Sequence, residues 1–176
     1  LLVNNAGFGG YGPFLETDAA SEEEMMRVNV IALTMLTKKF LPPMVAAGHG
    51  RVLNVSSVAA FQPGPLMTVY YATKAYVLSF SIALSDEVQG TGVTVTCLCP
   101  GPTKSGFSSH AGMASSRLFR TGVMEAAPVI RIGLDACMRG KALVVPGLKN
   151  KLLAFATRFA SRPFAAYMAH WAQKKM

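Results

Sequence analysis

Residues 93–99, VTVTCLC, form the stretch that decides the fold. The run is rich in β-branched residues, carries no charge, and ends at Pro100-Gly101-Pro102. Continuous runs of this kind are typical of strands in parallel sheets, because helices cover both faces of such sheets. Residues 93–99 therefore predict a buried strand of a parallel sheet.

Strand and helix patterns alternate on both sides of this run. Strands are expected at residues 1–5, 51–57 and 142–147, and helices at about residues 21–47, 68–88 and 125–139. The connections are long enough for right-handed crossovers between parallel strands. The order predicts an α/β fold, a Rossmann-like parallel sheet with helices on both faces.

The first helix carries both a start signal and a break signal. Ser21 is followed by three glutamates, which favours Ser21 as the N-cap of a helix with acids at its positive end. Pro42 and Pro43 predict a break before the helix ends near Ala47.

The composition fits one folded domain and excludes some function classes. The 176 residues are 51% hydrophobic and 15% charged, with a formal net charge of +8. No apolar run is long enough for a transmembrane helix. Zinc-finger, RNA-recognition and basic-zipper patterns are missing, so we expect no nucleic-acid partner and attribute the positive charge to an anionic cofactor or surface.

The three cysteines, Cys97, Cys99 and Cys137, predict buried thiols rather than a metal site. No second cysteine pair or nearby histidine completes a ligand set. Free thiols fit a reducing compartment, so the expected location is the cytoplasm and no metal is expected.

The stretch VYYATKAYV at residues 69–77 contains the only lysine of a mostly apolar helix pattern. Tyr70 lies four residues before Lys74, and Tyr71 lies three before it. Either offset brings a side chain next to the lysine on a helix, so spacing alone leaves both tyrosines open.

Five pieces in order resemble the short-chain dehydrogenase/reductase family over residues 1 to about 147. They are Asn4-Asn5-Ala6-Gly7, Asn29, Ser57, Tyr70-x-x-x-Lys74 and Pro100-Gly101. The family's tyrosine precedes its lysine by four residues and follows its serine by thirteen, as Tyr70 does. The resemblance therefore implies that Tyr70 is reactive and that Tyr71 packs elsewhere.

The resemblance implies an NAD(P)-dependent oxidoreductase that interconverts a carbonyl and an alcohol. Tyr70 would be the general acid/base, with its pKa lowered by Lys74. Ser57, at the carboxyl end of a strand, would hold the substrate oxygen. Asn29 would hold a water that links Lys74 to solvent.

The implied cofactor contacts come from two loops and from the helix that carries the motif. They are Asn5, Ala6, Gly7, Tyr70, Lys74, Pro100, Gly101, Thr103 and Ser105. The cofactor would be NAD or NADP, since the segment that chooses between them is not in the sequence. Ser105 stands where the family pattern usually has threonine.

Residues 106–123 would be the lid over the substrate. Its expected lining is Phe107, His110, Met113, Leu118 and Phe119. This mostly apolar lining predicts an apolar carbonyl substrate.

The family's T-G-x-x-x-G-x-G turn is not in this sequence, nor are about three strands that precede the NNAG motif. The expectation is an N-terminally truncated fragment, whose strand at residues 1–5 lies at a sheet edge and which is inactive alone. Without that turn, the pyrophosphate would lose its helix N-terminus.

Residues 148–176 form a basic and apolar tail, distinct from the domain at residues 1–147. A helix pair that packs on the domain is favoured, and the alternatives are an interfacial membrane helix or a partner-binding helix. Pro163 is expected to interrupt a long tail helix. The other functional alternative is a non-catalytic binding or scaffold module, and a complete protein would form a homo-oligomer.

Overall fold

The computed structural model describes residues 1–107, 111 and 122–174. In chain order its elements are β1 (Leu2–Asn4), α1 (Ala19–Met26), the π-helical segment η1 (Arg27–Ala32), α2 (Leu33–Ala46), β2 (Gly50–Val55), the 3₁₀ helix η2 (Val58–Phe61), α3 (Thr68–Glu87), β3 (Val93–Leu98), β4 (Thr103–Lys104), β5 (Met124–Glu125), α5 (Ala126–Met138), β6 (Leu143–Val144), α6 (Leu148–Ala156) and α7 (Arg162–Gln173).

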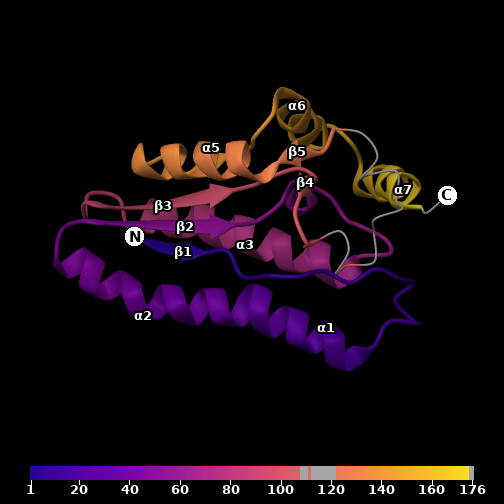
Figure 1. The fold of residues 1–176 in the computed structure, drawn as a ribbon, viewed down its shortest axis with the longest axis horizontal. Helices are drawn as coiled ribbons and strands as arrows, with labels where there is room; N and C mark the ends of the chain where they lie inside the picture. The colour runs from indigo at the N-terminus through magenta and orange to yellow at the C-terminus, as the bar shows by residue number, and fades with distance from the viewer. Residues whose placement is uncertain (108–110, 112–121, 175–176) are drawn as a thin grey trace.

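The main sheet is parallel, with the strand order β1-β2-β3-β6. Figure 1 shows α5 on one face of this sheet and α2 on the opposite face. Helix α3 lies on the same face as α2, because both supply side chains to one apolar cluster with the sheet. The predicted Rossmann-like sheet with helices on both faces is therefore confirmed, and β1 lies at its edge as expected.

Alternate residues of the central strands supply the core on the two faces. Val52 and Val95 are fully buried and pack with Leu84 of α3. Their neighbours Leu53 and Leu98 pack on the α5 side. Both faces are covered, which explains why the sequence of β3 is continuous rather than alternating.

The first helical rod corrects two expectations. Asp18, not Ser21, is the N-cap of α1, and its carboxylate accepts a 2.8 Å hydrogen bond from the Ser21 backbone N–H. The predicted break is also wrong, since Pro42 and Pro43 lie within α2. The carbonyls that lose a donor belong to residues 38 and 39, which are exposed, so water can replace the missing bonds.

Two short features were not predicted from the sequence. The helix η2 follows β2 directly, and β4 pairs with β5 in a small second sheet, with Thr103 opposite Met124. Strand β6 has only two residues, shorter than the predicted 142–147.

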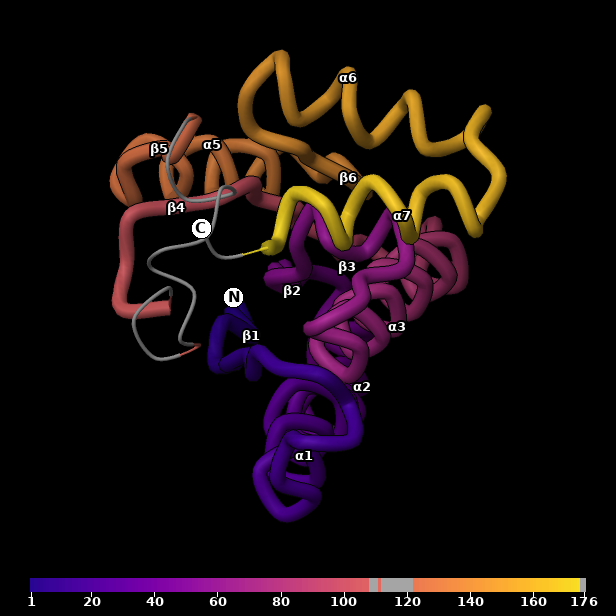
Figure 2. Tube along the Cα trace, turned by 90° about the vertical axis from the view of Figure 1, so that its right-hand side faces the viewer, coloured from indigo at the N-terminus to yellow at the C-terminus, as the bar shows by residue number. Residues whose placement is uncertain are grey.

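The tail forms two helices, α6 and α7, which lie in the same region of the molecule (Figures 1 and 2). Ser161 caps α7, and Pro163 lies in its first turn, where a missing N–H breaks no helical hydrogen bond. Pro163 therefore helps to start a helix instead of interrupting one. No helix among the described residues is both long and apolar enough to cross a membrane.

Candidate active site

A cavity of about 700 Å³ opens at the carboxyl ends of β2 and β3, and we call it the main cavity. Open parallel sheets form ligand sites at this edge. Most of the residues that the sequence singled out line it: Asn5, Gly7, Ser57, Tyr70, Lys74, Pro100, Gly101, Thr103 and Ser105. Asn29 and Ala6 are not in the lining.

Tyr70 lies in the first turn of α3 and is only 8% exposed. Its hydroxyl interacts electrostatically with the side chain of Ser57, which follows β2 and caps η2. Burial raises the pKa of Tyr70 above its ordinary value, and the interaction with Ser57 opposes this effect. Lys74 is not among the causes of this shift, so the lowering of the Tyr70 pKa that we expected from Lys74 does not act here.

Lys74 lies one turn further along α3, with its Nζ 5.8 Å from the centre of the Tyr70 ring. Its side chain is buried, and Nζ donates a 3.0 Å hydrogen bond to the carbonyl of Val55. Burial lowers the pKa of Lys74 to about 8, while Cys97 and Cys99 act in the opposite direction. A cation is therefore held beside Tyr70 at an energetic cost.

Asn29 lies in the π-helical segment η1 and is 1% exposed. Its Nδ2 donates to the carbonyl of Phe8 at 2.9 Å and to Oγ1 of Thr73 at 3.1 Å, and its Oδ1 accepts from the Phe8 N–H at 3.1 Å. Asn29 thus joins the NNAG loop to α3 from behind the main cavity. Sequence reasoning missed Thr73, since a threonine on a helix gives no distinctive signal.

Gly7 permits the NNAG loop to approach this cluster. A Cβ built on Gly7 would lie 2.8 Å from Asn29 Oδ1 and 3.4 Å from Lys74 Nζ. The first distance is shorter than real side chains adopt, so only glycine fits without a shift. Gly7 also lines the main cavity, where it can offer only backbone to a ligand.

Gly101 has a different reason to be glycine. Its Cβ would lie 2.5 Å from the side chain of Asn150 on α6. The space beside Gly101 is therefore filled by the tail.

Tyr71 points toward the tail, although it also lines the main cavity. Gln173 Nε2 on α7 donates a 2.8 Å hydrogen bond to the Tyr71 hydroxyl. Burial raises the pKa of Tyr71 to about 12, with the bonds from Gln173 and Gln62 opposing the shift. No sequence signal pointed to Gln173, which lies 102 residues away.

The lid prediction falls mostly on His110, Met113, Leu118 and Phe119, which lie outside the described residues. Phe107 is described, and its ring centre lies 5.1 Å from that of Tyr70. Val129 and Ile130 of α5 and Leu153 of α6 add apolar surface to the same cavity. One wall of the main cavity is thus apolar.

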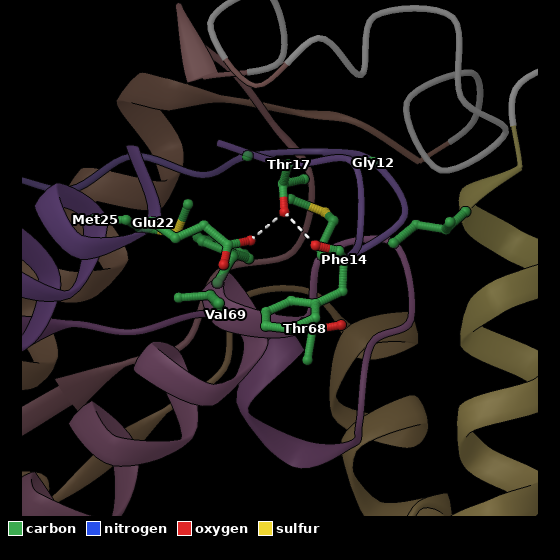
Figure 3. A pocket seen from close by; sticks show the side chains of 11 residues that line it. Gly12, Phe14, Thr17, Glu22, Met25, Thr68 and Val69 are labelled. Atoms are coloured by element: carbon green, nitrogen blue, oxygen red, sulfur yellow. Dashed lines mark hydrogen bonds between the residues drawn. The ribbon is translucent and has the colours of Figure 1, made fainter. Parts of the chain in front are cut away.

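A second, much smaller hollow lies between the loop after the NNAG motif and the start of α3 (Figure 3). Its volume is about 10 Å³, no more than one water molecule needs. Thr17 Oγ1 lies 3.0 Å from the Phe14 carbonyl and 2.7 Å from Glu22 Oε1, which closes the loop against α1. Of these two hollows, only the main cavity has room for a substrate.

The described residues contain no cluster of His, Cys, Asp and Glu that could hold a metal ion.

Comparison with known proteins identifies the family. Residues 1–114 match the family model described as short chain dehydrogenase. The chain belongs to the short-chain dehydrogenase family. Nodulation protein G of Rhizobium sp. (strain N33) is 32% identical over 133 residues, which are 76% of this chain and 53% of that protein. Estradiol 17-beta-dehydrogenase 11 of Macaca fascicularis is 39% identical over 110 residues, which are 61% of this chain and 37% of that protein.

Solved structures of the short-chain dehydrogenase family have the same fold. A short-chain dehydrogenase from Sphingobium yanoikuyae in complex with NADPH has a TM-score of 0.78 and 30% identity, over 90% of this chain and 63% of that one. A 7beta-hydroxysteroid dehydrogenase structure has a TM-score of 0.80 at 22% identity, over 95% of this chain and 65% of that one. The chain spans about half or less of the length of the curated relatives named above.

Proposed function

We propose that the protein to which this chain belongs is an NAD(P)-dependent oxidoreductase that interconverts a carbonyl and an alcohol. The observation that carries the proposal is the convergence of Ser57, Tyr70 and Lys74 on one cavity at the carboxyl ends of β2 and β3. Family membership supports it, and so does the NADPH complex of the Sphingobium relative.

The proton is the part of the reaction that this chain's residues would handle. Because burial raises the pKa of Tyr70, its hydroxyl keeps its proton at neutral pH and can donate it to a carbonyl oxygen. Ser57, which lines the same cavity as Tyr70, would donate a second hydrogen bond to that oxygen. A buried Lys74 ammonium beside the ring would favour the phenolate left behind. When bound, the nicotinamide supplies or accepts the hydride.

The cofactor and the substrate would bind on opposite sides of the main cavity. Asn5, Gly7 and Thr103 would hold the nicotinamide end of NAD or NADP, since all three line the main cavity and Gly7 offers only backbone there. Lys74, Pro100, Gly101 and Ser105 complete the proposed contacts, and Ala6 would act through its backbone. The opposite wall, with Phe107 and Ile130, favours an apolar carbonyl substrate.

A homo-oligomer is part of the proposal. Large apolar side chains are exposed on the outer sides of η1, α2 and α3, including Ile31, Met35 and Tyr76. Exposed apolar patches on adjacent helices favour association with a second copy.

The test uses Tyr70→Phe and Tyr71→Phe as a matched pair, in the protein that carries this chain. Reduction of bulky apolar ketones is followed by loss of NADH or NADPH absorbance. Tyr70→Phe should lower kcat by roughly 10²–10⁴-fold, and Tyr71→Phe should keep most of the activity. Equal activity of wild type and Tyr70→Phe would refute the assignment. Failure of the folded wild type to bind either nucleotide would favour the non-catalytic binding module.

A further inference from the structure

The tail helices expose their large apolar side chains and bury their small ones. The buried residues of α6 and α7 are Ala154, Ala165, Ala169 and Gln173. The exposed ones include Leu148 (73%), Leu152 (60%) and Tyr167 (69%). A helix that only packs on its own domain would have the reverse arrangement, because burial of large apolar groups drives such packing.

The exposed apolar residues form one stripe on each helix. On α6 the stripe is Leu148, Leu152 and Phe155, and on α7 it is Phe164, Tyr167 and Trp171. Spacings of three and four residues place the members of each set on one side of a helix. Both helices lie in the same region of the molecule (Figures 1 and 2), so the two stripes add apolar surface to that region. We call these six residues the tail face.

The charge around the tail face has one sign. Residues 148–176 contain no aspartate or glutamate. Lys149, Lys151, Arg158, Arg162 and Lys174 are all exposed there. The surface that complements this region of the molecule is therefore apolar within and anionic at its edge.

We propose that α6 and α7 dock the protein on an anionic lipid surface through the tail face. A bilayer interface offers acyl chains to the leucines and phenylalanines, a polar boundary to Tyr167 and Trp171, and anionic headgroups to the lysines and arginines. A second copy of this chain fits less well, because it would bring the same positive charges together. The docked helices lie on the membrane, since none of the described helices can span it.

Docking would bring the membrane next to the main cavity. Leu153 of α6 is 55% exposed and also lines that cavity. An apolar ligand dissolved in the bilayer would then have a short path into it.

The test uses Trp171, the single tryptophan of the chain, as an internal reporter. Vesicles of phosphatidylcholine mixed with phosphatidylglycerol should shift its emission to shorter wavelength, and flotation should carry the protein with them. Phosphatidylcholine vesicles alone should bind weakly. Raised salt should release the protein in part, because only the ionic contribution is screened.

Two variants and two controls separate the contributions. Lys151→Glu/Arg158→Glu should lower partitioning by roughly tenfold or more, since each basic residue near an anionic surface contributes about fivefold. Phe155→Ser/Tyr167→Ser should lower it even at low salt. Lys39→Glu and Leu15→Ser, which change exposed residues outside the tail, should leave it unchanged. Circular dichroism checks that each variant is folded.

Three outcomes would overturn the proposal. They are equal partitioning of the tail variants and wild type, a Trp171 shift that follows protein concentration without vesicles, and a shift produced as well by a DNA oligonucleotide as by anionic vesicles. The second would assign the tail face to self-association, and the third to nucleic acid.

Discussion

Gln173 Nε2 donates a 2.8 Å hydrogen bond to the hydroxyl of Tyr71, the residue next to Tyr70. The bond joins α7 to α3 in a buried place, where Gln173 is 1% exposed. Tyr11 adds a second tie, since its hydroxyl donates to the Gln173 carbonyl at 3.1 Å. The C-terminal end of α7 is therefore fixed beside the main cavity.

Removing the Tyr71 hydroxyl should destabilise the protein through Gln173. Within the described part of the chain Gln173 Oε1 is already buried without a hydrogen-bond partner, so Tyr71→Phe would leave both ends of the amide unsatisfied. The expected loss is about 1–3 kcal/mol in the free energy of unfolding, measured by urea titration. Tyr71→Phe/Gln173→Leu should lose less than the sum of the two single variants. Strict additivity would show that the bond makes no contribution.

Lys74 should make the stability depend on pH above neutrality. Its pKa is about 8 in the folded state and about 10.4 in an unfolded chain, so the unfolded chain binds more protons between these values. Stability should therefore rise from pH 8 to pH 10, relative to Lys74→Met, by on the order of 2 kcal/mol. Above pH 10 the raised pKa values of Tyr70 and Tyr71 act in the opposite direction. Parallel pH profiles of the two proteins would contradict a desolvated Lys74.

Gly7→Ala should disturb Asn29 more than it changes the loop itself. The new methyl group would lie 2.8 Å from Asn29 Oδ1, so the bonds of Asn29 to Phe8 must lengthen. A loss of roughly 1–3 kcal/mol in the free energy of unfolding is expected. Gly106→Ala is the matched control, because its Cβ would meet no atom of the described residues within 4 Å. If both variants unfold at the same denaturant concentration, the close approach at Gly7 has no energetic role.

Two alanine variants distinguish the observed start of α1 from the start predicted by its sequence. Asp18→Ala removes the acceptor of the Ser21 N–H and should lower stability by about 1 kcal/mol. Ser21→Ala should have little effect, because the capping contact uses the Ser21 backbone and keeps it. Thermal unfolding measures both, and a larger loss for Ser21→Ala would favour the start predicted from the sequence.

Local patterns predicted the sheet because its central strand is buried on both faces. The uncharged, β-branched run at residues 93–99 fits such a strand, and β2, β3 and β6 each follow a helix of crossover length. The sequence also predicted that Ser57 and Tyr70 lie close together. Ser57 follows the carboxyl end of β2, and Tyr70 lies in the first turn of α3; both line the main cavity.

The features that sequence reasoning missed depend on contacts between distant segments or on solvent. The Tyr71–Gln173 bond spans 102 residues, and nothing local to either residue encodes it. Pro42 and Pro43 carry a strong local break signal, but exposure of the preceding turn removes its cost. The direction of the Tyr70 pKa shift depends on burial, which motif spacing does not contain.

The bond between Gln173 and Tyr71 couples the position of α7 to ligand binding in the main cavity. Any ligand that holds Tyr71 in its bonded position raises the fraction of molecules with α7 in place, and whatever holds α7 in place favours that ligand by the same factor. The affinity of a ligand for the main cavity should therefore change when α7 is held in place, and by the same factor in both directions.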